Sequence, residues 1–243
     1  KLHPPNRGAD RSVIQLQASE GNMLPKIITL FLLSLATTAC STTPNIADLT
    51  TRAHAGEARA QFELASCYDM GHGFKLDRKQ AALWYQRASD QGYMPAKINL
   101  GWLYQMGQGV EQNFQTAIAL YRQAADKEYP QAQHNLACIY DEGLGIKEDN
   151  KQAVSWYQKA ADHGHPRACL NLGVMYMRGE GIATDVVKAY QWLTIARLLM
   201  TDKNDKWVAR AALDHLGKTI TAKQRKQARD AVDQWFKDRQ QSK

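Results

Sequence analysis

Residues 99–110 read NLGWLYQMGQGV, and residues 171–182 read NLGVMYMRGEGI. The second stretch lies two periods of 36 residues after the first, and related stretches occupy the positions one period before and one period after residue 99. The positions that recur four times are Ala60, Ala96, Ala132 and Ala168; Leu64, Leu100, Leu136 and Leu172; Tyr68, Tyr104, Tyr140 and Tyr176; and the glycine pairs Gly71/Gly73, Gly107/Gly109, Gly143/Gly145 and Gly179/Gly181. A fixed period of this length is typical of a solenoid, in which each repeat packs only on its neighbours.

Each repeat predicts two helices. In the first repeat, Ala60, Leu64 and Tyr68 follow one another at helical spacing, and Gly71 can adopt the left-handed conformation in which many helices end. A short polar side chain then stands where the second helix should begin, because its oxygen can accept a bond from an unpaired backbone N–H. These predicted N-caps are Asp77, Asn113, Asp149 and Asp185. The second helix of the first repeat carries Ala81, Trp84, Tyr85 and Ala88, and the other second helices carry their counterparts. The alanines should allow the two helices of a repeat to approach closely, and the aromatic side chains should fill the space between successive helix pairs.

These motifs resemble Sel1-like repeats, which are relatives of the tetratricopeptide repeat with a longer loop between the two helices. The resemblance covers residues 57–200, divided into repeats at 57–92, 93–128, 129–164 and 165–200. It implies an all-α fold, a right-handed α/α superhelical solenoid of four 36-residue helix pairs, and it does not fix a function. Residues 201–243 leave the period but still show helical spacing, with Thr221 as an N-cap, so we expect C-terminal capping helices there.

The N-terminal region predicts export. Met23 is followed by a lysine, a short uncharged run and then small residues before Cys40, which indicates a secretory signal over residues 23–40 that is too short to span a membrane. Cys40 resembles the lipidated cysteine of bacterial lipoproteins, and the alternative is plain secretion. By this resemblance the protein would be an outer-membrane lipoprotein that faces the periplasm, or a periplasmic or secreted protein if it is not lipidated. Residues 1–22 should lie outside the mature protein, and residues 41–56 should form a flexible tether.

The sequence contains few residues that suggest catalysis or metal binding. It has no nucleophile elbow, phosphate loop or zinc-protease motif. His165 and Cys169 lie four residues apart, but a structural zinc site needs four ligands and no others are evident. Cys67, Cys138 and Cys169 are expected to be buried thiols, because no two of them fall where a disulfide could form. We therefore expect no cofactor, no metal and no small-molecule substrate.

The surface of the first helices is the predicted functional site. In tetratricopeptide-type stacking these helices line the concave face, and the residues that point away from the partner helix follow from a rotation of 100° per residue. They predict a groove that binds a protein or peptide through apolar anchors, with charged side chains that set orientation. The residues are Phe62, Asp69, Met70, Ile98, Trp102, Met106, Asp141, Glu142 and Arg178. The alternative is that the apolar ones pack between neighbouring first helices.

Charge adds little to this prediction. Residues 201–243 hold 11 Lys or Arg against 6 Asp or Glu, whereas residues 41–200 hold 16 of each. A solvated helix face accounts for that surplus, and nucleic-acid binding is not expected. We therefore expect a non-enzymatic interaction scaffold or regulator at the cell envelope. The alternatives are an immunity-type inhibitor of a toxic effector and a β-lactamase-like or cell-wall hydrolase.

Overall fold

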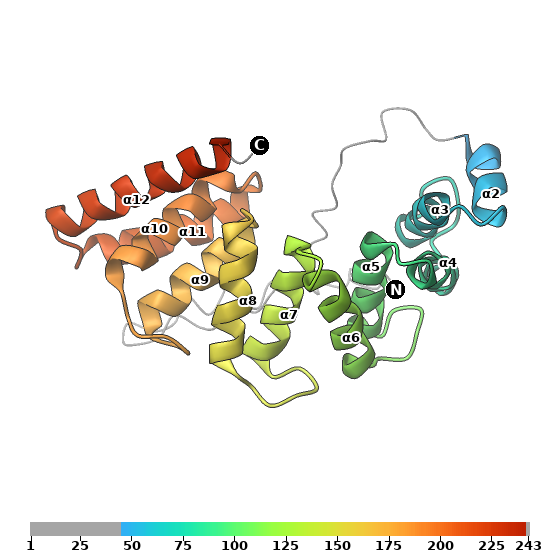
Figure 1. Ribbon diagram of the computed structural model, residues 1–243, viewed down its shortest axis with the longest axis horizontal. Coiled ribbons are helices and arrows are strands. Elements are labelled where there is room, and N and C mark those ends of the chain that lie inside the picture. The colour runs from blue at the N-terminus through green and yellow to red at the C-terminus, as the bar shows by residue number, and fades with distance from the viewer. Residues whose placement is uncertain (1–44, 242–243) are drawn as a thin grey trace, which may run out of the picture. The chain divides into compact units, whose positions relative to one another are not determined.

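A computed structural model describes residues 45–241, in which every regular element is a helix (Figure 1). Each helix from α2 to α10 packs on the next one in the chain, and α11 and α12 both pack on α10. The helices are α2 (Ile46–His54), α3 (Ala58–Met70), α4 (Arg78–Asp90), α5 (Met94–Met106), α6 (Phe114–Ala125), α7 (Pro130–Glu142), α8 (Asn150–Asp162), α9 (Pro166–Arg178), α10 (Val186–Leu199), α11 (Lys203–Gly217) and α12 (Ala222–Gln241). The pairs α3–α4, α5–α6, α7–α8 and α9–α10 confirm the predicted all-α solenoid of four repeats.

The helix ends follow the sequence signals. Gly71 has a φ of 72° and its N–H bonds to the carbonyl of Cys67, and the equivalent glycine ends each of the other three first helices in the same way. All four predicted N-caps are confirmed, because each side chain accepts bonds from backbone N–H groups in the first turn of its helix. The loop is closed at its base by a backbone bond such as Asp77 N to Tyr68 O, 2.9 Å, which recurs in every repeat.

The second glycine of each pair allows the repeats to approach closely. A Cβ atom at Gly109 would overlap the carbonyl of Arg78 at the start of α4, and a Cβ at Gly181 would overlap the carbonyl of Asn150 at the start of α8. The loop of one repeat therefore packs directly on the second helix of the preceding repeat. This contact and a positive φ, 76° at Gly109 and 69° at Gly181, both explain why glycine recurs at this position.

Buried tyrosines join successive repeats. Tyr85, Tyr121 and Tyr157 stand at one position of the second helices and are each fully buried. The hydroxyl of Tyr85 accepts a bond from Asn99 Nδ2 of the next repeat at 2.9 Å. Asn135 and Asn171, at the equivalent positions, lie near the hydroxyls of the other two tyrosines, which donate to Gln105 and Asp141 of their own repeats at 2.9 and 3.2 Å. A buried hydroxyl must be paired to avoid a desolvation penalty, so each pair fixes how one repeat stacks on the next.

The expectation that residues 41–56 form a flexible tether was wrong for the segment that the structure describes. Residues 46–54 form α2, whose Leu49 and Ala53 are buried against α3. These two residues lie 36 positions before Tyr85 and Ser89, so α2 occupies the place of a second helix from a preceding, incomplete repeat. Burial of its apolar face explains why a segment rich in threonine is helical here.

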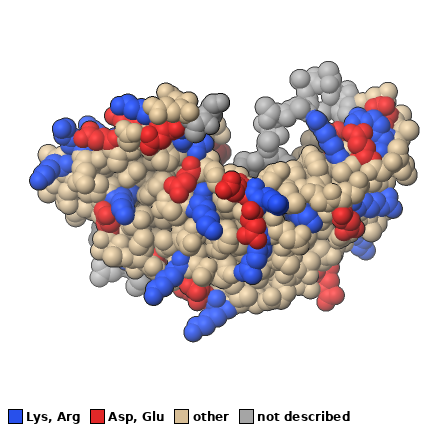
Figure 2. Space-filling view, viewed as in Figure 1, with Lys and Arg blue, Asp and Glu red and all other residues tan. Residues whose placement is uncertain are grey.

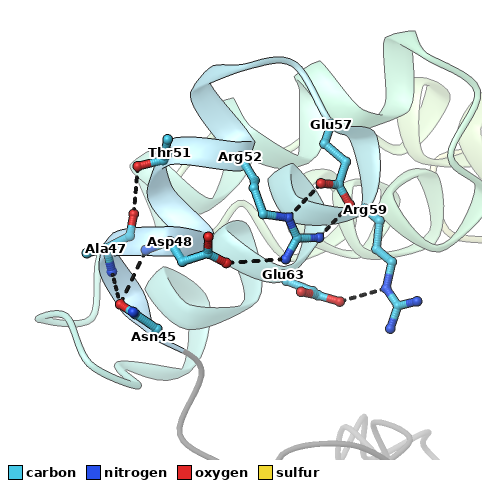
Figure 3. Close-up of polar contacts among 8 residues, drawn as sticks. All are labelled: Asn45, Ala47, Asp48, Thr51, Arg52, Glu57, Arg59 and Glu63. Carbon is cyan, nitrogen blue, oxygen red and sulfur yellow. Dashed lines mark hydrogen bonds and ion pairs between the residues drawn. The ribbon is translucent and has the colours of Figure 1, made fainter.

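Polar contacts hold both ends of α2 (Figure 3). The side chain of Asn45 accepts bonds from the backbone N–H groups of Ala47 and Asp48, at 3.1 and 3.3 Å, and so caps the first turn. At the other end, Arg52 makes a two-pronged ion pair with Glu57, at 2.6 and 2.7 Å. Gly56, with a φ of 96°, turns the chain into α3 and lies one period before Gly92, whose φ is 80°.

The C-terminal helices cover the last repeat, as predicted. Thr221 and Gln224 form a reciprocal cap at the start of α12, with Thr221 N to Gln224 Oε1 at 3.0 Å and Gln224 N to Thr221 Oγ1 at 3.3 Å. Trp235 packs edge-on against Trp192 of α10, with 6.4 Å between the ring centres. Arg239 Nη1 donates to the carbonyl of Asp162 at the end of α8, at 2.6 Å. The predicted signal segment, Cys40 and residues 1–22 lie outside the described residues.

Candidate protein-binding surface

Large apolar side chains are exposed where the first two repeats meet their loops. Met70 and Met106 end α3 and α5 at equivalent positions and are 38% and 37% exposed. Leu76, in the loop beside Met70, is 51% exposed, and Trp102 lies one turn before Met106 and is partly buried. We call Met70, Leu76, Trp102 and Met106 the methionine surface. Methionine and aromatic side chains are enriched in the cores of protein interfaces.

Trp102 lies at the junction of the first two repeats. Its ring is 5.9 Å from the guanidinium carbon of Arg78 on α4, and Arg78 is paired with the carboxylate of Asp69 at 3.2 Å. Burial raises the pKa of Asp69, and Arg78 opposes that rise. Within residues 45–241, the indole N–H of Trp102 is buried and has no hydrogen-bond acceptor. A buried donor without an acceptor is energetically costly.

Other residues predicted for the surface lie inside the stack. Phe62 packs against Tyr85 and Tyr93, with ring centres 5.7 and 5.3 Å away, and Ile98 is 8% exposed within a core cluster. Asp69 is also buried. Phe62 and Ile98 stand two positions before the buried leucine of their helices. Phe62 packs on Tyr93 of the next repeat, while Ile98 joins a core that includes Leu136 of the next repeat. Little of these side chains is therefore accessible to a partner.

The charged residues of the later repeats are half-buried and engaged. Asp141 accepts a bond from the hydroxyl of Tyr157 at 3.2 Å, so it helps to satisfy a buried group. Arg178 lies 3.7 Å from Glu180, and its side chain is 15% exposed. Glu142 ends α7 and is half-buried. Trp102 is thus linked to Asp69 through Arg78, and Met70 and Met106 end the two neighbouring first helices, whereas Asp141, Glu142 and Arg178 lie on other repeats. The binding role of all nine residues stays a prediction.

Sequence reasoning missed Leu76. Its counterparts one, two and three periods later are Gln112, Glu148 and Thr184, all of them polar. An apolar residue at a loop position that is otherwise polar was the available signal. Its Cβ atom lies close to Gly71, directly after Met70, so Leu76 extends the same exposed surface.

A pair of histidines lies between the third and fourth repeats. The rings of His134 and His165 stack with their centres 4.5 Å apart. His134 is buried and its Nε2 lies 3.6 Å from Cys138 Sγ, while His165 Nε2 lies 3.0 Å from Gln131 Oε1. Burial lowers the pKa of His134 to about 4, and burial followed by the proximity of His134 lowers the pKa of His165 well below its ordinary value. Both rings are therefore neutral at pH 7.

His165 and Cys169 make structural contacts with backbone groups. His165 Nδ1 accepts from the backbone N–H of Ala168 and so caps α9, and the thiol of Cys169 lies 3.8 Å from the carbonyl of Ala161. Cys67, Cys138 and Cys169 are buried thiols, as predicted. In the part of the chain that the structure describes, no cluster of three or more His, Cys, Asp or Glu side chains could hold a metal ion. Nor does any helix of that part have the length and apolar character needed to cross a membrane.

Comparison with known proteins agrees with the repeat boundaries. The family model for the Sel1 repeat matches residues 58–93, 95–129, 130–165 and 166–199, each match beginning one or two residues after the boundary inferred from the sequence. No curated protein matches the chain.

The solved structures similar to this chain include two with a TM-score above 0.5. One is a protective antigen of uropathogenic Escherichia coli strains with an SLR fold, at 40% identity and a TM-score of 0.61 over 63% of this chain. The match spans only 32% of that antigen, so it informs on the repeats and not on the whole protein. The other is a Sel1 repeat protein from Oxalobacter formigenes, at 27% identity and a TM-score of 0.58, over 71% of this chain and 76% of that one.

Proposed function

Because this chain belongs to the Sel1 repeat family, we propose that it is a non-enzymatic scaffold or regulator that binds a protein or peptide at the methionine surface. Repeats of this family are generally interaction scaffolds, and stacked repeats present extended surfaces for macromolecules. The proposal places the partner against the first two repeats rather than along the whole predicted concave face.

The observation that carries the proposal is the exposure of Met70, Leu76 and Met106 around Trp102. In the third and fourth repeats Glu142 and Arg178 replace the methionines, and Leu76 of the first repeat is replaced by Gln112, Glu148 and Thr184 in the other three. The apolar character is therefore specific to the first two repeats and is not required by the fold. A partner that covers this surface removes apolar area from water, which stabilises a complex.

The same surface predicts polar features of the partner. Arg78 lies beside the ring of Trp102, and its side chain is 36% exposed. A carbonyl or carboxylate oxygen next to an apolar side chain fits this cation, because a hydrogen bond from a charged donor is stronger than one between neutral groups. We therefore expect the partner to place an apolar residue against the methionines and an oxygen near Arg78.

Site-specific photo-crosslinking in the natural host tests the proposal. A photoreactive amino acid at Met70 or Met106 should give the same crosslinked partner. The matched control is Leu83 on α4, which is 55% exposed but does not belong to the methionine surface. A partner captured equally well from Leu83, or from none of the three positions, would argue against this surface.

Lipidation of Cys40 is a separate proposal. It rests on the uncharged run and the small residues that precede the cysteine in the sequence. A lipid there would place the repeats at the surface of the outer membrane on the periplasmic side. Mass spectrometry of the mature N-terminus decides the question, and an unmodified Cys40 would reject the proposal.

A further inference from the structure

The start of α12 carries the densest positive charge of the described chain. Residues 216–229 contain five Lys or Arg and no Asp or Glu. Four of these side chains are exposed, and we call them the α12 basic cluster: Lys218, Lys223, Lys226 and Arg229. Figure 2 shows blue atoms at the left end of the molecule, where Figure 1 places the start of α12.

The fold holds this cluster in place. The fifth cation, Arg225, turns inward: its Nη2 donates to the carbonyl of Gly217 at 3.3 Å, and its guanidinium lies 5.9 Å from the ring of Tyr190 on α10. This contact and the Thr221 cap fix the turn between α11 and α12. The four exposed cations therefore project from a rigid turn and the first two turns of one helix.

The arrangement is unfavourable without a counter-charge. Lys223, Lys226 and Arg229 are spaced by three residues and so share one helix face, where like charges destabilise a helix. Lys223 also stands in the first turn of α12, where the helix dipole disfavours a cation. Among residues 45–241, none of the four cations lies within ion-pair distance of a carboxylate in the structure. An anionic surface would offset each of these costs.

The chemistry of the cluster favours one kind of anion. No aromatic residue lies between Trp207 and Trp235, and the nearby ring of Tyr190 is partly buried beside Arg225, so nucleic-acid bases would find no fully exposed ring on which to stack. Three of the four cations are lysines and no exposed apolar anchor accompanies them, whereas protein interfaces are depleted in lysine and enriched in aromatic residues. A lysine ammonium is a compact charge that suits phosphate oxygens. Clusters of four or more basic residues are typical of binding to anionic lipid headgroups.

We propose that the α12 basic cluster docks the C-terminal end of the solenoid onto an anionic phospholipid surface. The contact is electrostatic and lies at the opposite end of the repeat array from the methionine surface. It depends neither on the partner proposed above nor on a lipid at Cys40. Docking at this end would leave the first two repeats accessible to a partner.

Binding of the full-length chain to vesicles tests the proposal. Vesicles of phosphatidylglycerol and phosphatidylcholine should bind the chain more strongly than vesicles of phosphatidylcholine alone. Replacement of all four cluster residues by glutamine should lower the partition constant at least about 100-fold, because each cation near such a surface contributes roughly five-fold. The matched control replaces four exposed lysines elsewhere, Lys79, Lys127, Lys147 and Lys151, and removes the same charge. Its partition constant should change less than about five-fold.

Amide hydrogen exchange measures protection at the start of α12 separately from membrane contacts made by other parts of the chain. Anionic vesicles should slow amide exchange in residues 218–230 of the natural chain and not of the cluster variant. Absence of that protection would overturn the proposal, even if the chain binds vesicles by its N-terminal region. An equal loss of binding in the two glutamine variants would overturn it as well. So would tighter binding to a single-stranded oligonucleotide than to the anionic vesicles at the same salt concentration.

Discussion

The stacked pair of His134 and His165 predicts that acid weakens the junction between the third and fourth repeats. Two periods earlier the same place is occupied by Phe62 and Tyr93, whose ring centres are 5.3 Å apart. The histidines therefore fill an aromatic position in the stack, and they are stable there only while neutral. The charged group that acts on both rings is Arg167 of α9, which lowers the pKa of each further.

The sign and size of the effect follow from the pKa of His134. Burial lowers this pKa from the ordinary value of 6.5 to about 4 in the folded chain, so the unfolded chain binds the proton more readily between pH 6.5 and pH 4. Stability is therefore fully present above pH 6.5 and is lost as the pH falls toward 4. For this histidine alone the loss between pH 7 and pH 5 is roughly 2 kcal/mol, and His165 acts in the same direction.

Urea unfolding followed by circular dichroism between pH 5 and pH 7 measures this loss. The test variant His134→Phe/His165→Tyr copies the pair of the first junction and should flatten the pH dependence by about 2 kcal/mol or more. The control His215→Gln removes an exposed histidine of α11 and should leave it unchanged. Burial raises the pKa of Asp69 and of Asp162. Measurements are therefore made at pH 5 and above, where protonation of these carboxylates contributes less to the change in stability. An unchanged pH dependence in the double variant would refute the reasoning.

Three further predictions concern stability and binding. Leu136→Ala should destabilise the chain by about 2–5 kcal/mol in urea unfolding, because Leu136 is fully buried in the third repeat. Tyr121→Phe should cost about 1–3 kcal/mol in the same assay, because it leaves the buried Oε1 of Gln105, 2.9 Å away, without its donor. Trp102→Ala should weaken binding to the captured partner by about 2 kcal/mol or more in calorimetry, and unchanged affinity together with an unchanged thermal melt would remove Trp102 from the site.

The period of the sequence was sufficient to predict the fold. Each recurring residue has a local physical role: a glycine that ends a helix, an aspartate or asparagine that caps one, an alanine or leucine that packs between two. Such roles depend on neighbours that are themselves repeated, so one unit predicts the others. The segment before the first repeat was missed because only part of the pattern is present there. Leu49, Ala53 and Gly56 lie 36 residues before Tyr85, Ser89 and Gly92. The leucine, tyrosine and glycine pattern of a first helix does not precede them in the sequence.

The candidate site was less predictable for a physical reason. Rotation about a helix axis shows which side chains point away from the partner helix, but not how closely the next repeat approaches. Phe62 and Ile98 point outward by that rule and are nevertheless covered by the following repeat. Met70 and Met106 lie about two turns further along, at the helix ends, where the neighbouring loops leave them exposed. Exposure is a property of the assembled stack and cannot be read from one helix.

The paired tyrosines also explain where the regular stack ends. At the three junctions between complete repeats, a buried tyrosine hydroxyl meets an asparagine of the next first helix. At the junctions with α2 and with α11 the tyrosine position is taken by Leu49 and Leu193, both buried, and the asparagine position by Glu63 and Trp207. The hydroxyl and its partner thus disappear together, which avoids a buried unpaired group at either end. A buried tyrosine hydroxyl needs a polar partner on the neighbouring helix, whereas a buried leucine needs only apolar contact. Helices that lack the asparagine, such as α3 beside α2 and α11 beside α10, can therefore pack at the two ends of the array.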